Sequence, residues 1–242
     1  PLKALLRFPG VAVAYGLPLL ATGALALAPS AGDPRASWAH GKPVGDLADK
    51  PNAIVIMVDT LRADHTGGYP GADALNAPHM AQLAADGVVF EQAFAQASWT
   101  RSSGASLMTS MLPSAHNADL KASSLSGDAV TFAEVLQAGG ATTGALINNI
   151  NLTSTFHFDQ GWDTFLYEAP AYRFGATESV FGLSMYKVVH KVAEKVLGKH
   201  KQVERFYQPA EVVLGDAKGF VQANRDGRWA LFVHLMEPHA PY

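Results

Sequence analysis

The stretch Asn52-Ala53-Ile54-Val55-Ile56-Met57-Val58-Asp59 decides the fold class of this chain. Its apolar run Ala53–Val58 is rich in β-branched residues and has the length of a buried strand. Asp59 follows the run directly, and an acid at the end of a buried strand is costly unless it binds a cation or hydrogen-bond donors. Asp59 is therefore either a carboxylate ligand for a hard metal ion or a cap for the turn Thr60–Asp64, and its position leaves both open.

Strand-like and helix-like segments alternate from this stretch onward. Helices are expected at Pro78–Asp86, at Arg101–Met111, after a capping box at Thr131–Glu134, and at about 179–197 and 209–224. Further strands are expected at Val88–Phe94, Thr142–Ile147 and Trp229–Met236. This alternation predicts an α/β fold with a mostly parallel sheet that is sandwiched by helices.

The composition restricts the class of protein. The chain has 242 residues, of which 48% are apolar and 16% charged, so it can bury a sizeable core. A formal net charge of −3 without a basic stripe argues against a nucleic-acid partner. The absence of cysteine excludes disulfides, thiolate metal sites and a cysteine nucleophile.

Residues 1–32 are expected to form a signal peptide or a transmembrane anchor. Two basic residues precede the uncharged segment 8–32, whose apolar core Val11–Ala28 is nearly as long as the ~20 residues of a spanning helix. Ala26-Leu27-Ala28 also suits a signal-peptide cleavage site, so both alternatives stay open. Either one predicts membrane association through residues 8–32 and places the domain after them on the periplasmic or extracellular face.

The remaining chain divides into a linker and a folded domain. Residues 33–51 are rich in Pro, Gly, Asp and Ala without apolar periodicity, which is typical of a linker. The folded domain is therefore expected to cover residues 52–242.

Two further segments follow predicted strands, where parallel sheets bind their ligands. Thr100 lies at the start of a predicted helix, where Thr is a favoured N-cap and where an anion also binds well. Its position alone favours the cap over a nucleophile. His239 lies in the loop after the last strand, where it is either solvated or donates to a substrate oxygen. If a metal site forms, the Asp59 carboxylate and the Thr100 hydroxyl should lie within about 6 Å of each other.

The same segments resemble, in order, motifs of the sulfatase branch of the alkaline phosphatase superfamily. The matching pieces are Asn52–His65, Ala77–Met80 leading to Gly87–Phe90, Ser98–Thr100 with Leu107–His116, Phe158–Asp163 and Glu237–Tyr242. Each piece is weak by itself, but five in family order are specific to the superfamily. The resemblance implies an alkaline-phosphatase-like fold, truncated at the C-terminus.

The resemblance also implies roles for particular residues. Asp59 would be a metal ligand, Thr100 the nucleophile that also touches the metal, and His239 a contact to the transferred group. Arg101 and Asn149 would bind substrate; Asn149 lies in the stretch that replaces the family's Lys-Trp-His. The cofactor would be a divalent ion, calcium, magnesium, manganese or zinc. The family's remaining ligands, an Asp-His pair, fall beyond the segment that matches His239, so the chain resembles the N-terminal half of such a domain.

Departures from the family pattern bear on the chemistry. Sulfatases carry Cys or Ser in the pattern Cys/Ser-x-Pro/Ala-x-Arg and oxidise it to formylglycine, whereas residues 100–104 read Thr-Arg-Ser-Ser-Gly. Threonine has no route to that aldehyde, and Thr100 looks like the unmodified threonine of phosphoglycerol and phosphoethanolamine transferases. Thr60 also replaces the second of the family's paired aspartates.

The expected function is that of a metal-dependent hydrolase or transferase that acts on phosphate or sulfate esters through Thr100. Its substrate would be a small-molecule, lipid or glycan ester. Two alternatives remain: a sulfuric ester hydrolase, and a catalytically inactive sulfatase-like domain that serves as an extracellular binding module.

Overall fold

The computed structural model describes residues 51–69, 71–72, 77–168, 184–197 and 207–239. The chain divides into two compact units. The larger, residues 37–168 with 209–242, contains the sheet and the predicted site. In the other unit, the helix α8 (Ser184–Leu197) falls within the predicted helix 179–197.

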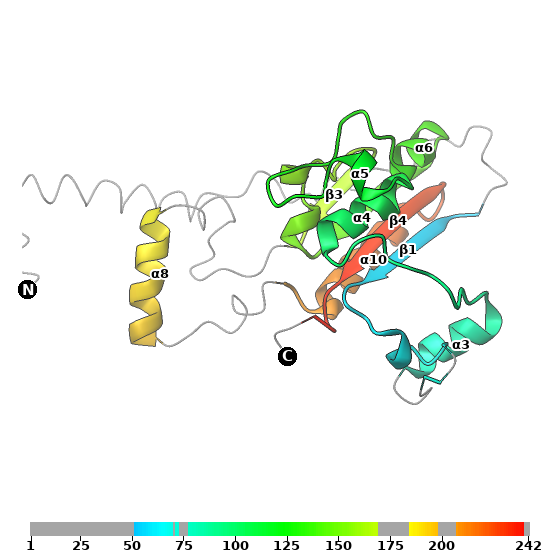
Figure 1. Cartoon of the computed structure of the whole chain (residues 1–242), viewed down its shortest axis with the longest axis horizontal. Coiled ribbons are helices and arrows are strands. Elements are labelled where there is room, and N and C mark those ends of the chain that lie inside the picture. The colour runs from blue at the N-terminus through cyan, green and yellow to red at the C-terminus, as the bar shows by residue number, and fades with distance from the viewer. Residues whose placement is uncertain (1–50, 70, 73–76, 169–183, 198–206, 240–242) are drawn as a thin grey trace, which may run out of the picture. The chain divides into compact units, whose positions relative to one another are not determined.

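Four parallel strands form the sheet of the larger unit (Figure 1). They are β1 (Ala53–Val58), β2 (Thr142–Ile147), β3 (Thr164–Tyr167) and β4 (Trp229–Leu235). Their order is β1-β4-β2-β3, and every neighbouring pair is parallel. All four carboxyl ends therefore lie at one edge of the sheet, which is where a ligand site is expected.

Helices pack on both faces of the sheet (Figure 1). The helices α4 (Thr100–Thr109) and α6 (Phe132–Ala138) share a core with Phe232, whose ring lies 6.1 Å from that of Trp162. On the opposite face, Phe220 of α10 (Ala210–Ala223) shares a core with Leu231 and Val233 of β4, the two residues on either side of Phe232. The other helical elements of the unit are η2 (Ala63–His65), α3 (Pro78–Asp86), α5 (Pro113–His116), η4 (Ile150–Leu152) and η5 (Ser154–Phe156).

Several predicted elements have the expected bounds. The strands Ala53–Val58 and Thr142–Ile147 and the helix Pro78–Asp86 match residue for residue. The capping box is also confirmed: the Glu134 amide donates to Thr131 Oγ1 at 3.2 Å, and the Thr131 amide donates to Glu134 Oε2 at 2.8 Å. Local capping chemistry thus fixes where α6 begins.

The predicted strand Val88–Phe94 is wrong. This segment is irregular, and its side chains Val88 and Phe90 are 80% and 74% exposed. Among the described residues it pairs with no strand, and an apolar run without a hydrogen-bonding neighbour does not form a sheet strand. β1 is likewise less buried than its apolar run predicts, because Ile54 and Ile56 are about half exposed.

The predictions for residues 1–32 and 33–51 lie outside the described residues, except for residue 51 at the end of the predicted linker. Within the described ranges, no helix combines the length and the apolar character needed to span a bilayer.

Candidate active site

The site is built around Asp59, which directly follows β1. Its amide continues the ladder by donating to the Leu235 carbonyl at 2.9 Å, and the residue is 7% exposed. The next residue, Thr60, has a φ of +54°, a left-handed conformation that is strained for a β-branched residue. The chain therefore turns sharply at the end of β1 and leaves the carboxylate at the carboxyl edge of the sheet.

Side chains from three other segments meet one oxygen of this carboxylate. The Thr100 hydroxyl donates to Asp59 Oδ2 at 3.0 Å, and Asn149 Nδ2 donates to it at 3.4 Å. His234 Nε2 lies 3.3 Å from the same oxygen, within ion-pair distance but not aligned for an ideal hydrogen bond. The expected proximity of Asp59 and Thr100 is met, and the partners of Asp59 come from distant segments rather than from the turn Thr60–Asp64.

Thr100 is not a helix cap. The N-cap of α4 is Trp99, whose carbonyl accepts from the Ser103 amide at 3.1 Å, and Thr100 is the first helical residue. Its hydroxyl points to Asp59 instead of to a backbone amide. The cap that position alone favoured is therefore wrong, since the hydroxyl's partner lies 41 residues earlier in the chain. Thr100 is placed at a helix N-terminus, where negative charge is stabilised.

Polar contacts along α4 hold this helix in place. Ser102 Oγ donates to Asp119 Oδ1 at 3.0 Å, and Ser106 Oγ lies 3.1 Å from Nε2 of the fully buried His116. The Ala118 amide donates to His116 Nδ1, so the ring hydrogen is on Nε2 and is donated to Ser106. Burial also lowers the pKa of His116, which keeps this ring neutral. The Ser106–His116 pair therefore serves the fold rather than a reaction.

Arg101 has structural partners for its guanidinium group. Nη1 donates to the carbonyls of Leu120, Lys121 and Ser123 at 2.7–3.3 Å, and Nη2 donates to Asn151 Oδ1 at 3.1 Å. The guanidinium also stacks on the Phe156 ring, 3.2 Å from its centroid. These contacts favour a role in tying loops to α4, and substrate binding by Arg101 stays a prediction.

Gly104 occupies the position of the arginine in the sulfatase pattern. A Cβ built at Gly104 would lie 2.7 Å from Leu152 Cδ2, so α4 packs closely against η4 at this point. A side chain here would displace Leu152, which is fully buried. Close packing against Leu152 therefore favours glycine at position 104, where the family pattern has arginine.

Electrostatics favour an ionised Asp59. Burial by itself would raise the pKa of the carboxyl group. The contact with His234, the hydrogen bond from Thr100 and the charge of His239 together outweigh burial and lower the pKa below its ordinary value of 3.8. A carboxylate held ionised in a buried position is suited to binding a cation.

A cavity of about 530 Å³ opens in front of these groups. Asp59, Thr100 and His239 line it together with Ser103 and Asn151. His239 is fixed by its amide, which donates to the Met236 carbonyl at 2.8 Å. The structure therefore brings Asp59, Thr100 and His239 to one cavity. Asn149 is not among the residues that line it, but its side chain donates to Asp59.

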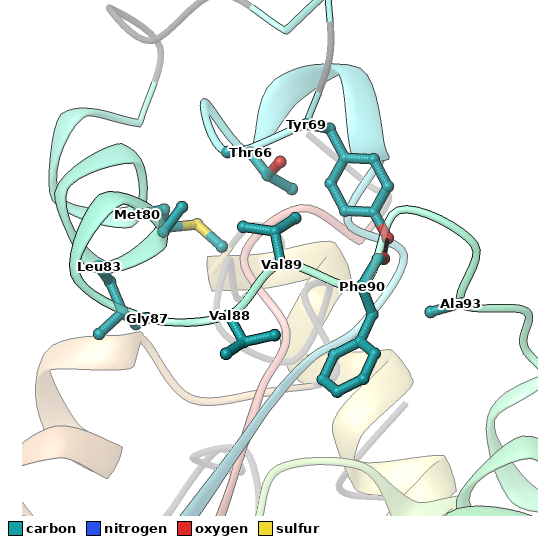
Figure 2. Close-up of a pocket in the computed structure, with 11 residues that line it drawn as sticks. Thr66, Tyr69, Met80, Leu83, Gly87, Val88, Val89, Phe90 and Ala93 are labelled. Carbon is teal, nitrogen blue, oxygen red and sulfur yellow. Dashed lines mark hydrogen bonds between the residues drawn. The ribbon is translucent and has the colours of Figure 1, made fainter.

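A second cavity of similar volume has a different character (Figure 2). It lies between α3 and the segments around Tyr69 and Phe90, and the Tyr69 hydroxyl donates to the Phe90 carbonyl at 2.6 Å. Its lining is mostly apolar and includes none of the predicted site residues. The predicted site residues therefore gather at the cavity at Asp59 and not at this second cavity.

Sequence reasoning missed His234. This histidine is completely buried inside the apolar run of β4 and contacts Asp59. The signal was present, since a titratable side chain in a buried strand is costly without a partner, as it is for Asp59.

The described residues supply only part of a metal site. Asp59 offers a carboxylate and Thr100 a hydroxyl on the same side of one cavity, which are oxygen ligands of the kind that hard divalent ions prefer. Within the described ranges, however, no three His, Cys, Asp or Glu side chains are grouped to hold a metal ion. The donor set fits one side of a divalent site, and further ligands are required.

A parallel sheet with helices on both faces and a cavity at its carboxyl edge defines an α/β protein with a candidate ligand site at that edge. The family model described as Sulfatase matches residues 51–242, and the chain therefore belongs to the sulfatase family, within the alkaline phosphatase superfamily. No curated protein matches the sequence significantly.

Solved structures agree with this fold. BT4656, solved in complex with its substrate D-glucosamine-2-N,6-O-disulfate, is 20% identical with a TM-score of 0.51 and covers 79% of this chain and 35% of its own. Ps i-CgsB, solved in complex with k-i-k-neocarrahexaose, is 19% identical with a TM-score of 0.54, at 79% and 46% coverage. This chain thus spans less than half the length of either protein.

Proposed function

We propose that this protein is a metal-dependent hydrolase or transferase that attacks phosphate esters through Thr100. The observation that carries the proposal is the 3.0 Å hydrogen bond from the Thr100 hydroxyl to the buried Asp59 carboxylate at the mouth of the cavity. A hydroxyl at a helix N-terminus beside a carboxylate is a nucleophile next to half of a cation site. The family's Asp-His pair would complete the ligand set.

The reaction begins with in-line attack of Thr100 Oγ1 on phosphorus. The Oγ1–P bond forms, the bond to the leaving oxygen breaks, and the threonine proton passes to solvent in the cavity, since Asp59 stays ionised. His239 lines the same cavity and supplies a proton to the leaving oxygen. Water or an acceptor alcohol then attacks phosphorus and gives its proton to His239, while the Oγ1–P bond breaks and Thr100 Oγ1 regains a proton from solvent. A divalent cation bound at Asp59 would lower the pKa of the threonine hydroxyl and offset charge on the ester oxygens.

Sulfate esters are the second candidate substrate. The family match favours this class, as does the disulfated sugar that the BT4656 structure holds as its substrate. Against it stands Thr100, which lacks the chemistry to become formylglycine. A glycan, lipid or small-molecule ester would fit a cavity of about 530 Å³.

Replacement of Thr100 tests the nucleophile. Thr100→Ala should lower turnover of an activated phosphodiester by at least about 10³-fold, because an activated nucleophile contributes more than about 4 kcal/mol to the barrier. Thr100→Ser keeps a hydroxyl and should stay active. Thr109→Ala is the matched control, because it removes a hydroxyl from the other end of α4.

Intact-mass measurement then identifies the intermediate. With a slow phosphodiester, an adduct should form on Thr100 in the parent protein and be absent in Thr100→Ala. Turnover of an aryl sulfate in place of the phosphodiester would select the second candidate. Parent-like activity in Thr100→Ala would rule out the mechanism, and no turnover of either ester would favour a catalytically inactive binding domain.

We also propose that residues 1–32 direct the protein to the periplasmic or extracellular face. The support is the basic start and the uncharged segment 8–32. A fusion of residues 1–51 to a reporter that is active only after export should be active, and a reporter that stays in the cytoplasm would contradict the proposal.

A further inference from the structure

His234 calls for an explanation because it is a completely buried imidazole that the proposed reaction does not use. It lies on β4, one residue before that strand ends. Burying an imidazole among apolar side chains costs free energy unless its polar atoms find partners. What the ring contacts therefore indicates why it is there.

Strand alternation places His234 on the same face of the sheet as the proposed nucleophile. Phe232 belongs to the core beneath α4, whereas Val233 belongs to the core beneath α10. Since side chains alternate along a strand, His234 shares the α4 face with Phe232. Its register partner on β1 is Met57, and Asp59 lies two residues beyond Met57 on the same face. The fold thus brings His234, Asp59 and the start of α4 together.

The polar contact of His234 is with Asp59. Nε2 lies 3.3 Å from Asp59 Oδ2, within ion-pair distance, so a ring hydrogen on Nε2 would face an oxygen that can only accept. Both ring nitrogens are buried, and neither has a hydrogen-bond partner of full geometry among the described residues, so the ion-pair contact with Asp59 is the polar contact that the structure describes for this ring. His116 differs, because both of its ring nitrogens join α4 to the loop that follows it. His234 is therefore suited to holding Asp59 rather than to a network that stabilises the fold.

The described contacts with the Asp59 carboxylate all fall on Oδ2. They come from Thr100, Asn149 and His234 at 3.0, 3.4 and 3.3 Å. A carboxylate whose one oxygen is fixed by donors has a set orientation, and its other oxygen is directed to a single place. Hydrogen bonds of this kind to ligating carboxylates tune metal affinity.

We propose that His234 is a positioning residue that holds the Asp59 carboxylate through Oδ2 and so directs Oδ1 to a divalent cation. The cation part of this inference rests on the proposed function. The contact between His234 and Asp59 does not, and it can be tested without metal. A histidine that merely filled space in the core would leave the carboxylate unaffected when replaced.

The first experiment observes the contact by nitrogen-15 NMR of the metal-free protein. A ring N–H resonance that is protected from exchange should be present in the parent protein and missing in His234→Leu. It should shift in Asp59→Asn and stay unchanged in Asp64→Asn, a control in which an exposed carboxylate paired with Arg62 is neutralised. A His234 resonance that is unchanged in Asp59→Asn would overturn the inference.

The second experiment measures binding of Ca²⁺, Mg²⁺, Mn²⁺ and Zn²⁺ to the full-length protein by calorimetry, because the site requires ligands beyond those described. His234→Leu should weaken the tightest of these about 10–100-fold, the usual effect of losing a partner of a metal ligand. His234→Gln, which keeps a donor near the Nε2 position, should remain within a few-fold of the parent. Phe232→Leu should also bind like the parent, because it changes the same face of β4 without touching Asp59.

The outcomes separate this inference from the proposed function. If the parent protein binds a cation and His234→Leu binds it equally tightly, only the positioning role fails. If the parent binds none of the four cations, the cation part of the proposed function fails together with the cation part of this inference, whereas the contact between His234 and Asp59 is decided by the NMR experiment alone.

Discussion

Two neighbouring stretches on one face of the sheet differ sharply in burial. On the face that meets α10, Leu231 and Val233 of β4 are 2% and 0% exposed. Their register partners on β1, Ile54 and Ile56, are 53% and 52% exposed. The two strands are equally apolar, so the difference comes from α10, which packs against β4 and β2. An apolar strand face thus becomes core only where another element covers it.

Apolar side chains are also exposed after α3. Among the residues after α3, Val88, Phe90 and Phe94 are 74–80% exposed. Clustered apolar side chains at a protein surface usually mark a place where another element or molecule packs. Asp59 and His234 lie on the opposite face of the sheet, which α4 covers and where the core side chains are buried.

The largest expected effect is on the covered strand. Leu231→Ala should lower the free energy of unfolding by about 2–5 kcal/mol, because it removes buried apolar contacts and leaves a cavity. Ile54→Ala, at the register partner, should cost less than about 1 kcal/mol, because half of that side chain is already in water. Urea denaturation monitored by circular dichroism measures both. Equal losses would show that β1 is covered in solution.

The sequence predicted the elements whose signals are local. Bounds of β1, β2 and α3 followed from apolar runs, proline and glycine, and the start of α6 followed from Thr131 and Glu134. The segment Val88–Phe94 begins with a short apolar run, as β1 does. It lacks a neighbouring strand, and pairing between distant segments leaves no local signal.

The site shows the same division. Asp59 and His239 could be selected because they follow strands, and both line the cavity. The position of Thr100 alone favours a cap because the short-range partner is the commoner one, and the resemblance was needed to place Thr100 in the site, since its hydroxyl bonds a residue 41 positions away. β3 was missed because four residues are too short for a periodicity, and His234 because the apolar run around it concealed it.

Acid should lower the free energy of unfolding through protonation of Asp59. Its pKa is lowered from 3.8 in the folded protein, so the ionised carboxylate contributes stability that is present above pH 3.8 and is lost as pH falls through the lower folded value. When the free energy of unfolding is measured by urea denaturation as a function of pH in metal-free buffer, Asp59→Asn should reduce its dependence on pH in that range. Asp86→Asn is the control, at an exposed carboxylate on α3, and should leave the profile unchanged. A profile that Asp59→Asn leaves as steep as the parent's would contradict the assignment.

Loss of the capping box should cost less than a core truncation. Thr131→Ala removes the side chain that accepts from the Glu134 amide and should lower stability by about 1 kcal/mol. Thr131→Ser keeps the hydroxyl acceptor and should retain most of the stability that the capping box contributes. Thermal unfolding of the three proteins measures the difference, and an unchanged midpoint in Thr131→Ala would mean that α6 is held by packing alone.

The smallest expected effect is a gain in stability at Thr60, in the turn after β1. Thr60 has a φ of +54°, which costs a β-branched residue roughly 1–2 kcal/mol, whereas asparagine tolerates this region. Thr60→Asn should therefore stabilise the protein by about 0.5–1 kcal/mol. Thr60→Val keeps the branch and should show no gain. Thr66→Asn is the matched control, because Thr66 has an ordinary φ of −87°. If Thr60→Asn and Thr60→Val unfold at the same denaturant concentration, the turn is not strained, and the end of β1 is set by the contacts of Asp59 instead.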